Sequence, residues 1–87
     1  MSWQVLISKR AKKDVNKLIA ARLWGNARKL IDILGENPYQ TPPPFEKLQG
    51  NLAGLYSRRI NIQHRLVYQV LEEERIVRVL QMWTHYK

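Results

Sequence analysis

Four cationic or titratable side chains stand close together in the segment Asn51–Tyr68, which reads NLAGLYSRRINIQHRLVY. They are Arg58, Arg59, His64 and Arg65. The segment predicts a tight β-hairpin, and β-structure is normally built from β-branched and aromatic residues rather than from guanidinium groups. Three arginines within eight residues around one turn therefore indicate a surface that holds phosphate.

Two further groups could transfer protons. Glu46 is a single acid in a Pro-rich stretch, and His85 and Tyr86 lie at the end of the sequence, where packing rarely requires such residues. A carboxylate can remove a proton, and an imidazole with a pKa of about 6.5 can donate one. Glutamate, arginine and histidine together are the parts of a metal-free ribonuclease.

In such a reaction the ribose 2′-OH is the nucleophile, an acid protonates the leaving 5′-oxygen, and the guanidinium of Arg65 offers donors to the phosphorane. Each positioned acid or base contributes roughly 10²–10⁴-fold. Glu46 has no acidic neighbour, the chain has no cysteine, and its two histidines are far apart in sequence. We therefore expect no metal site and no cofactor.

Length and composition limit the fold and the partners. With 87 residues, residues 1–87 should form one domain, and a hydrophobic content of 45% is normal for a globular chain. We see no signal peptide and no membrane span, and the lack of cysteine fits the cytoplasm. The net charge of +8 predicts a polyanionic partner such as nucleic acid or an acidic protein.

The N-terminal half predicts one strand and two helices. Trp3–Ile7 is apolar on both faces and predicts an interior strand. Ser8 is a candidate N-cap for a helix over residues 9–23. Gly25 and Asn26 predict a turn, after which apolar residues at helical spacing predict a second helix over residues 27–34, ended by Gly35.

The C-terminal half predicts β-structure. The proline-rich segment 37–45 should form a stiff strap across a surface, followed by an irregular segment, 46–54. Strands are expected at 55–60, 65–71 and 75–83, with turns between them. The order β-α-α-β-β-β predicts an α+β fold with a twisted, mostly antiparallel sheet and a helical hairpin packed on one face.

The segment Phe45–Tyr68, FEKLQGNLAGLYSRRINIQHRLVY, with HY near the end of the chain, resembles the Txe/YoeB family of bacterial toxins. This family belongs to the RelE superfamily of ribosome-dependent messenger RNA endonucleases. Its pattern is close to PExLxxNLxGx(W/Y)SRRIxxxHRLVY, ending in YHY. The resemblance implies a RelE-like microbial ribonuclease fold and no cofactor. The match departs from the pattern at Phe45, Gln49, Thr84 and the extra Lys87.

The resemblance also implies roles for individual residues. Glu46 matches the family's catalytic general base, Arg65 its catalytic arginine and His85 its general acid. Tyr86 and Arg59 match residues that hold the RNA substrate. The family often has lysine at the position of Gln49, and the nearby Lys47 is expected to make that RNA contact.

Several interpretations stay open at this point. The leading one is a toxin that cuts messenger RNA in the A site of the 70S ribosome and is inhibited by a cognate acidic antitoxin of the Phd/YefM type. The others are a non-catalytic basic RNA- or DNA-binding module and an interaction protein with an acidic partner. The sequence does not decide whether the chain forms a homodimer. Arg58 and Arg59 alternate along a strand, so both cannot point into one groove, and one of them should be structural or contact a partner elsewhere. His64 should be a turn residue that packs the hairpin.

Overall fold

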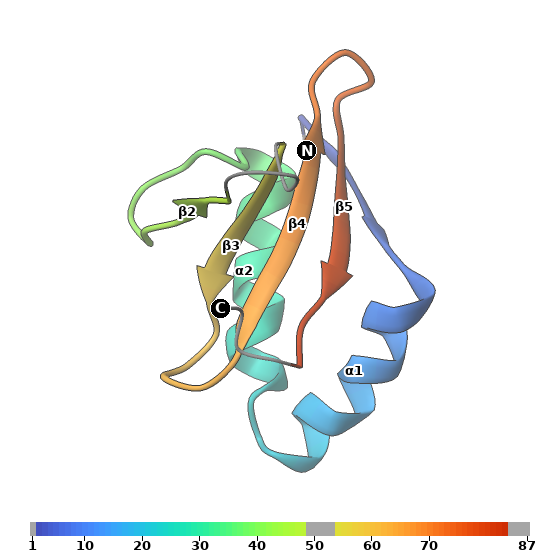
Figure 1. Ribbon diagram of the computed structural model, residues 1–87, viewed down its shortest axis with the longest axis vertical. Coiled ribbons are helices and arrows are strands. Elements are labelled where there is room, and N and C mark those ends of the chain that lie inside the picture. Colours follow the sequence, from blue (N-terminus) through green and yellow to red (C-terminus); the bar gives the residue numbers. More distant parts are fainter. Residues whose placement is uncertain (1, 49–53, 84–87) are drawn as a thin grey trace.

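The computed structural model describes residues 2–48 and 54–83 (Figure 1). A five-stranded sheet has the order β1-β5-β4-β3-β2, with β1 parallel to β5 and all other neighbours antiparallel. The expected α+β fold is confirmed. The elements are β1 (Gln4–Ile7), α1 (Lys9–Ala20), α2 (Trp24–Glu36), β2 (Glu46–Lys47), β3 (Leu55–Arg59), β4 (Arg65–Leu71) and β5 (Ile76–Gln81).

The strand register sorts the side chains of the sheet into two faces. Tyr68 of β4 lies opposite Val79 of β5, and both are fully buried in one core with Leu18 of α1 and Leu34 of α2. Figure 1 shows α2 running behind β3 and β4. Successive residues of a strand point to opposite faces. The neighbours of these core residues therefore lie on the second face, which we call the open face because neither α1 nor α2 packs on it.

The turn between the helices differs from the prediction. Helix α1 ends at Ala20, and Arg22 has a left-handed backbone with φ of 61°. The N–H of Leu23 donates to the carbonyl of Leu18, and that of Arg22 donates to the carbonyl of Ile19. This is a Schellman motif, which normally has glycine at the left-handed position. Since the chain turns there, the predicted turn at Gly25 and Asn26 is wrong, and both residues belong to α2.

Two strand predictions also need correction. Strand β1 pairs only with β5, so it is an edge strand and not an interior one, and its Leu6 is 41% exposed. Glu46–Lys47 is a short strand paired with Tyr56 and Ser57 of β3, where an irregular path was expected. Apolar residues along a strand bear on what covers the faces of the sheet and not on which strands pair beside it. In β1 only Val5 and Ile7 pack against the core, whereas Gln4 and Leu6 are exposed.

The longer of the two helices, α2, has 13 residues, whereas a membrane span needs about 20. Within residues 2–48 and 54–83 no helix is long and apolar enough to cross a membrane.

Candidate functional site

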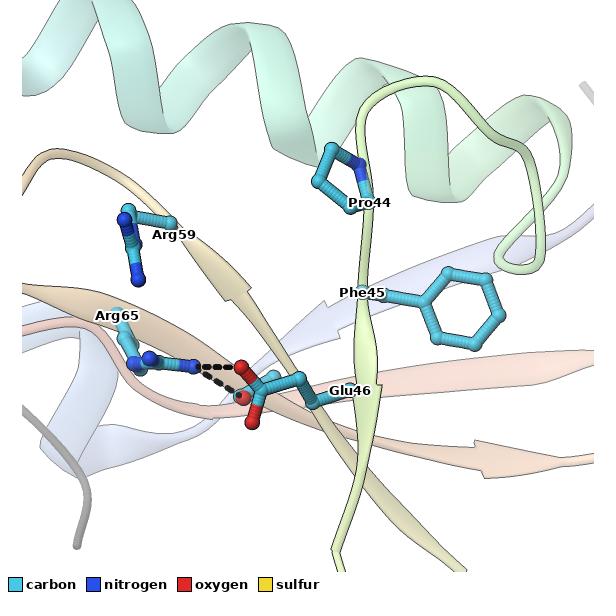
Figure 2. A pocket seen from close by; sticks show the side chains of 6 residues that line it. Pro44, Phe45, Glu46, Arg59 and Arg65 are labelled. Carbon is cyan, nitrogen blue, oxygen red and sulfur yellow. Dashed lines mark hydrogen bonds and ion pairs between the residues drawn. The ribbon is translucent and has the colours of Figure 1, made fainter.

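The candidate site is a hollow on the open face, beside the edge formed by β2. Glu46 lies opposite Ser57, and Arg59 of β3 lies opposite Arg65 of β4, so these four side chains share one face. Their hollow has a volume of about 230 Å³ (Figure 2), and it is lined by Pro44, Phe45, Glu46, Ser57, Arg59 and Arg65. Pockets that enclose small molecules usually measure about 300–1,000 Å³. This one suits part of a polymer better than a whole small ligand.

An ion pair lies at the centre of the hollow (Figure 2). Arg65 Nη1 donates to Glu46 Oε1 at 2.9 Å and to Ser57 Oγ at 3.5 Å. The Arg65 side chain is 20% exposed and that of Glu46 is 64% exposed. An exposed pair of this kind contributes only about 0–1 kcal/mol. An incoming phosphate could therefore take over the donors of Arg65 and release Glu46.

The two neighbouring arginines of β3 have different roles, as their alternation predicts. Arg59 is exposed and lines the hollow, whereas Arg58 is 1% exposed and points to the helix-covered face. The Arg58 guanidinium donates to three backbone carbonyls and to the hydroxyl of Tyr68, at 2.7–3.2 Å. Those carbonyls belong to Pro38, Gln40 and Pro43.

These bonds fix the proline-rich segment 37–45, the strap that leads directly into Glu46. A proline-rich segment has few backbone N–H groups of its own. Its buried carbonyls therefore need hydrogen-bond donors from other parts of the chain. Phe45 packs against Tyr56 at 5.8 Å between ring centres and lies 5.0 Å from the Arg58 guanidinium carbon. Burial raises the pKa of Tyr68, and the adjacent Arg58 opposes that rise. Arg58 therefore anchors the segment that carries Glu46.

His64 packs in the hairpin, as expected. It is 7% exposed and stacks on Trp83, with 4.0 Å between ring centres and an angle of 18° between the rings. Its Nδ1 has no hydrogen-bond partner among the described residues. His64 therefore supports the beginning of β4, next to Arg65, and does not line the hollow.

One further predicted site residue, Lys47, does not line the hollow. Lys47 is exposed on β2 and, one residue after Glu46, points to the other face. His85 and Tyr86 fall outside the described residues. Ser57 was not predicted, although it shares a strand face with Arg59 and bonds Arg65. The sequence could have indicated Ser57, because it lies two residues before Arg59 on the same strand and therefore points to the same face.

Three comparisons with known proteins agree on one family. The chain is 40% identical to the toxin YoeB of Mycobacterium bovis over 63 residues, which cover 69% of this chain and 72% of that protein. Its fold matches a YoeB/ParE toxin from Agrobacterium tumefaciens with a TM-score of 0.84 and 28% identity, over 95% of this chain and 99% of the other.

Two matching structures come from Staphylococcus aureus, and both are 28% identical over 99% of this chain and 100% of the other. One is a YoeB dimer, with a TM-score of 0.82, and the other is a YoeB–YefM complex, with a TM-score of 0.79. The family model that describes YoeB-like toxins of bacterial type II toxin-antitoxin systems matches residues 2–86. This chain therefore belongs to the family of YoeB-like toxins.

Proposed function

We propose that this toxin is an endoribonuclease that cleaves messenger RNA in the A site of the ribosome and thereby inhibits translation. The observation that carries the proposal is the ion pair of Glu46 and Arg65 in an open hollow, with Arg59 beside it. A module that only binds RNA needs cations and has no use for an exposed carboxylate among them. A ribonuclease needs both.

In the proposed reaction the scissile phosphate binds to Arg65 and Arg59, and the carboxylate of Glu46 accepts the proton of the ribose 2′-OH. The 2′-oxygen attacks phosphorus, the bond to the 5′-oxygen breaks, and the leaving oxygen takes a proton from His85. The upstream fragment then ends in a 2′,3′-cyclic phosphate. Arg65 supports the phosphorane with donors of fixed geometry. Tyr86 contributes to substrate binding. Lys47 points away from the hollow, so it contributes only where the RNA passes the β2 edge of the sheet. No metal ion takes part.

The contacts of Trp83 support a place for His85 in this site. Trp83 stacks on His64, which directly precedes Arg65, and His85 follows Trp83 by two residues in the sequence. Two residues of chain span at most about 7 Å, so His85 follows closely on a residue that is fixed beside the start of β4.

The proposed partners follow the relatives. A YoeB protein from Staphylococcus aureus has been found in a complex with YefM, and this chain has a net charge of +8. We expect an acidic antitoxin of the Phd/YefM type to bind it in the cytoplasm and to cover the hollow, because opposite charges favour fast and specific association.

The test is single-turnover cleavage of messenger RNA on programmed 70S ribosomes. Glu46→Gln keeps the size of the side chain and removes its charge, so we expect cleavage to fall by about 10²-fold or more while circular dichroism is unchanged. His85→Gln should have a similar effect. Glu74→Gln, the same change at an exposed position in the turn between β4 and β5, is the matched control and should keep the wild-type cleavage rate.

The ends of the product test the chemistry separately. The upstream fragment should carry a 2′,3′-cyclic phosphate or a 3′-phosphate, and a substrate with 2′-deoxyribose at the cut site should stay intact. Full cleavage by both the Glu46 and His85 variants would contradict the assignment of these residues. A 3′-hydroxyl product would contradict the mechanism itself.

A further inference from the structure

Most of the net charge of this chain lies on α1, on the turn that follows it and on the first part of α2. Eight of the fifteen lysines and arginines stand between positions 9 and 29, against one acid, so this segment has a formal charge of +7 out of +8. The rest of the chain has seven cations and six acids. We call the eight residues the helical cations: Lys9, Arg10, Lys12, Lys13, Lys17, Arg22, Arg28 and Lys29.

The helical cations are exposed and unneutralised. All eight side chains face solvent, and within residues 2–48 and 54–83 the single ion pair joins Arg65 to Glu46. The one acid of the segment, Asp14, is 6% exposed and accepts a hydrogen bond from the backbone N–H of Met82. Asp14 therefore holds α1 to the end of β5 and does not screen the lysines.

This arrangement is unfavourable for the helix itself. The first turn of α1 contains Lys9 and Arg10 and no acid, although the positive end of the helix dipole favours acids there by about 0.3–1 kcal/mol each. Lys9, Lys13 and Lys17 also follow one another at four-residue spacing, and like charges at this spacing repel. Folding alone gives no reason for this pattern, whereas a polyanionic ligand does.

The helical cations are too far from the hollow to serve it. The helices pack on one face of the sheet and the hollow lies on the open face. A helix is about 10–12 Å across, and charges are screened beyond about 8 Å at physiological ionic strength. Cations on the outer side of the helices therefore contribute little to a phosphate bound at Arg65.

We propose that the helical cations form a second RNA-binding face, which holds the phosphate backbone of a folded, double-stranded RNA. If the proposed function is right, the toxin bridges two RNA segments, with the message in the hollow and a structured RNA on the helices. Double-stranded RNA is recognised mainly through its shape and phosphates. The row of Lys9, Lys13 and Lys17 extends for about 12 Å along α1 and suits such a ligand.

The composition of this face favours RNA over an acidic protein. Among the described residues between positions 9 and 29, Ile19 is the one large apolar side chain that is exposed, at 54%. Protein interfaces usually have an apolar core, whereas nucleic acid interfaces are polar and strongly positive.

The test measures binding of the full-length protein to an RNA hairpin with a stem of about 16 base pairs, at several salt concentrations. In the triple variant Lys9→Gln, Lys13→Gln and Lys17→Gln, we expect about tenfold or more weaker binding. The slope of log affinity against log salt should become shallower by about 2–3. The triple Lys→Arg variant at the same positions should bind as the wild type does.

Two controls locate the face. Arg78→Gln removes an exposed cation of the open face outside the hollow and should keep both the affinity for the hairpin and its salt slope. The readout is binding and not cleavage, so this test stands apart from the proposed nuclease function. A variant with Gln4→Glu, Gln63→Glu and Gln69→Glu has the same net charge as the Lys→Gln triple and should bind nearly as the wild type does. All variants are first compared by circular dichroism.

Three results would overturn the proposal. The first is wild-type affinity and slope in the folded Lys→Gln triple. The second is an equal loss in the glutamate triple, which would show that only net charge matters. The third is unchanged hairpin binding together with weaker binding of an acidic antitoxin, which would assign the helical cations to a protein partner.

Discussion

Arg58 and Arg59 are adjacent and chemically identical, yet the fold uses them in opposite ways. Arg58→Met removes four hydrogen bonds. It leaves the carbonyls of Gln40 and Pro43 without a donor, whereas that of Pro38 keeps the bond from the Tyr68 hydroxyl, so we expect the free energy of unfolding to fall by about 2–4 kcal/mol. Arg59→Met is the matched control and should stay within about 0.5 kcal/mol of the wild type. Urea denaturation measures both, and equal midpoints for the two variants would contradict the anchoring role of Arg58.

The chemistry of single residues was the most predictable part of the site. Alternation along β3 predicts that Arg58 and Arg59 face opposite ways, and it could also have placed Ser57 beside Arg59. Which arginine faces the hollow was not predictable, because that choice depends on where the carbonyls of the strap lie. Pro38 and Pro43 lie 20 and 15 residues before Arg58, and no local sequence pattern predicts a contact between residues so far apart.

At the scale of elements, a glycine led to one wrong prediction, the turn between the two helices. Helix α1 ends at Ala20, and the left-handed residue that follows it is Arg22 and not a glycine, so the usual sequence signal for a helix end is missing. Gly25, three residues later, suggested the turn instead. Amphipathic spacing located both helices and all three long strands, because burial on one face imposes that spacing. Which strands pair side by side, such as β1 with β5, is not indicated by the spacing of apolar residues.

Two glycines test these backbone assignments with one kind of substitution. Gly25 lies inside α2, and a Cβ atom added to it would meet no heavy atom within 4 Å, so Gly25→Ala should stabilise the fold by about 0.5–1 kcal/mol. Gly54 has equal space but a φ of +84°, so Gly54→Ala should destabilise it by about 1 kcal/mol. Thermal unfolding followed by circular dichroism should move the two melting temperatures in opposite directions. A lower melting temperature for Gly25→Ala would argue against a helical Gly25.

At the scale of the whole molecule, the sheet separates two charged surfaces. The net charge of +8 predicts a polyanionic partner, but composition does not show where on the surface that charge lies. The fold places Arg59 and Arg65 on the open face and the helical cations on the layer behind it. The first pair lies beside a carboxylate and suits chemistry. The second group has only the buried Asp14 within its own segment, and among the described residues the exposed Asp32 on the next turn of α2 makes no ion pair with it, so this group suits binding.

A truncation after Trp83 separates the two surfaces in one molecule. The described core that joins the helices to the sheet is built from residues between Trp3 and Trp83, and His64 stacks on Trp83 itself, so we expect circular dichroism and the melting temperature to change little. The truncation removes His85 and Tyr86 and should therefore lose cleavage on ribosomes as severely as His85→Gln does. It keeps all eight helical cations, so binding to the RNA hairpin should persist with nearly the same salt slope. Loss of hairpin binding in the folded, truncated chain would mean that the tail and the helices act as one surface.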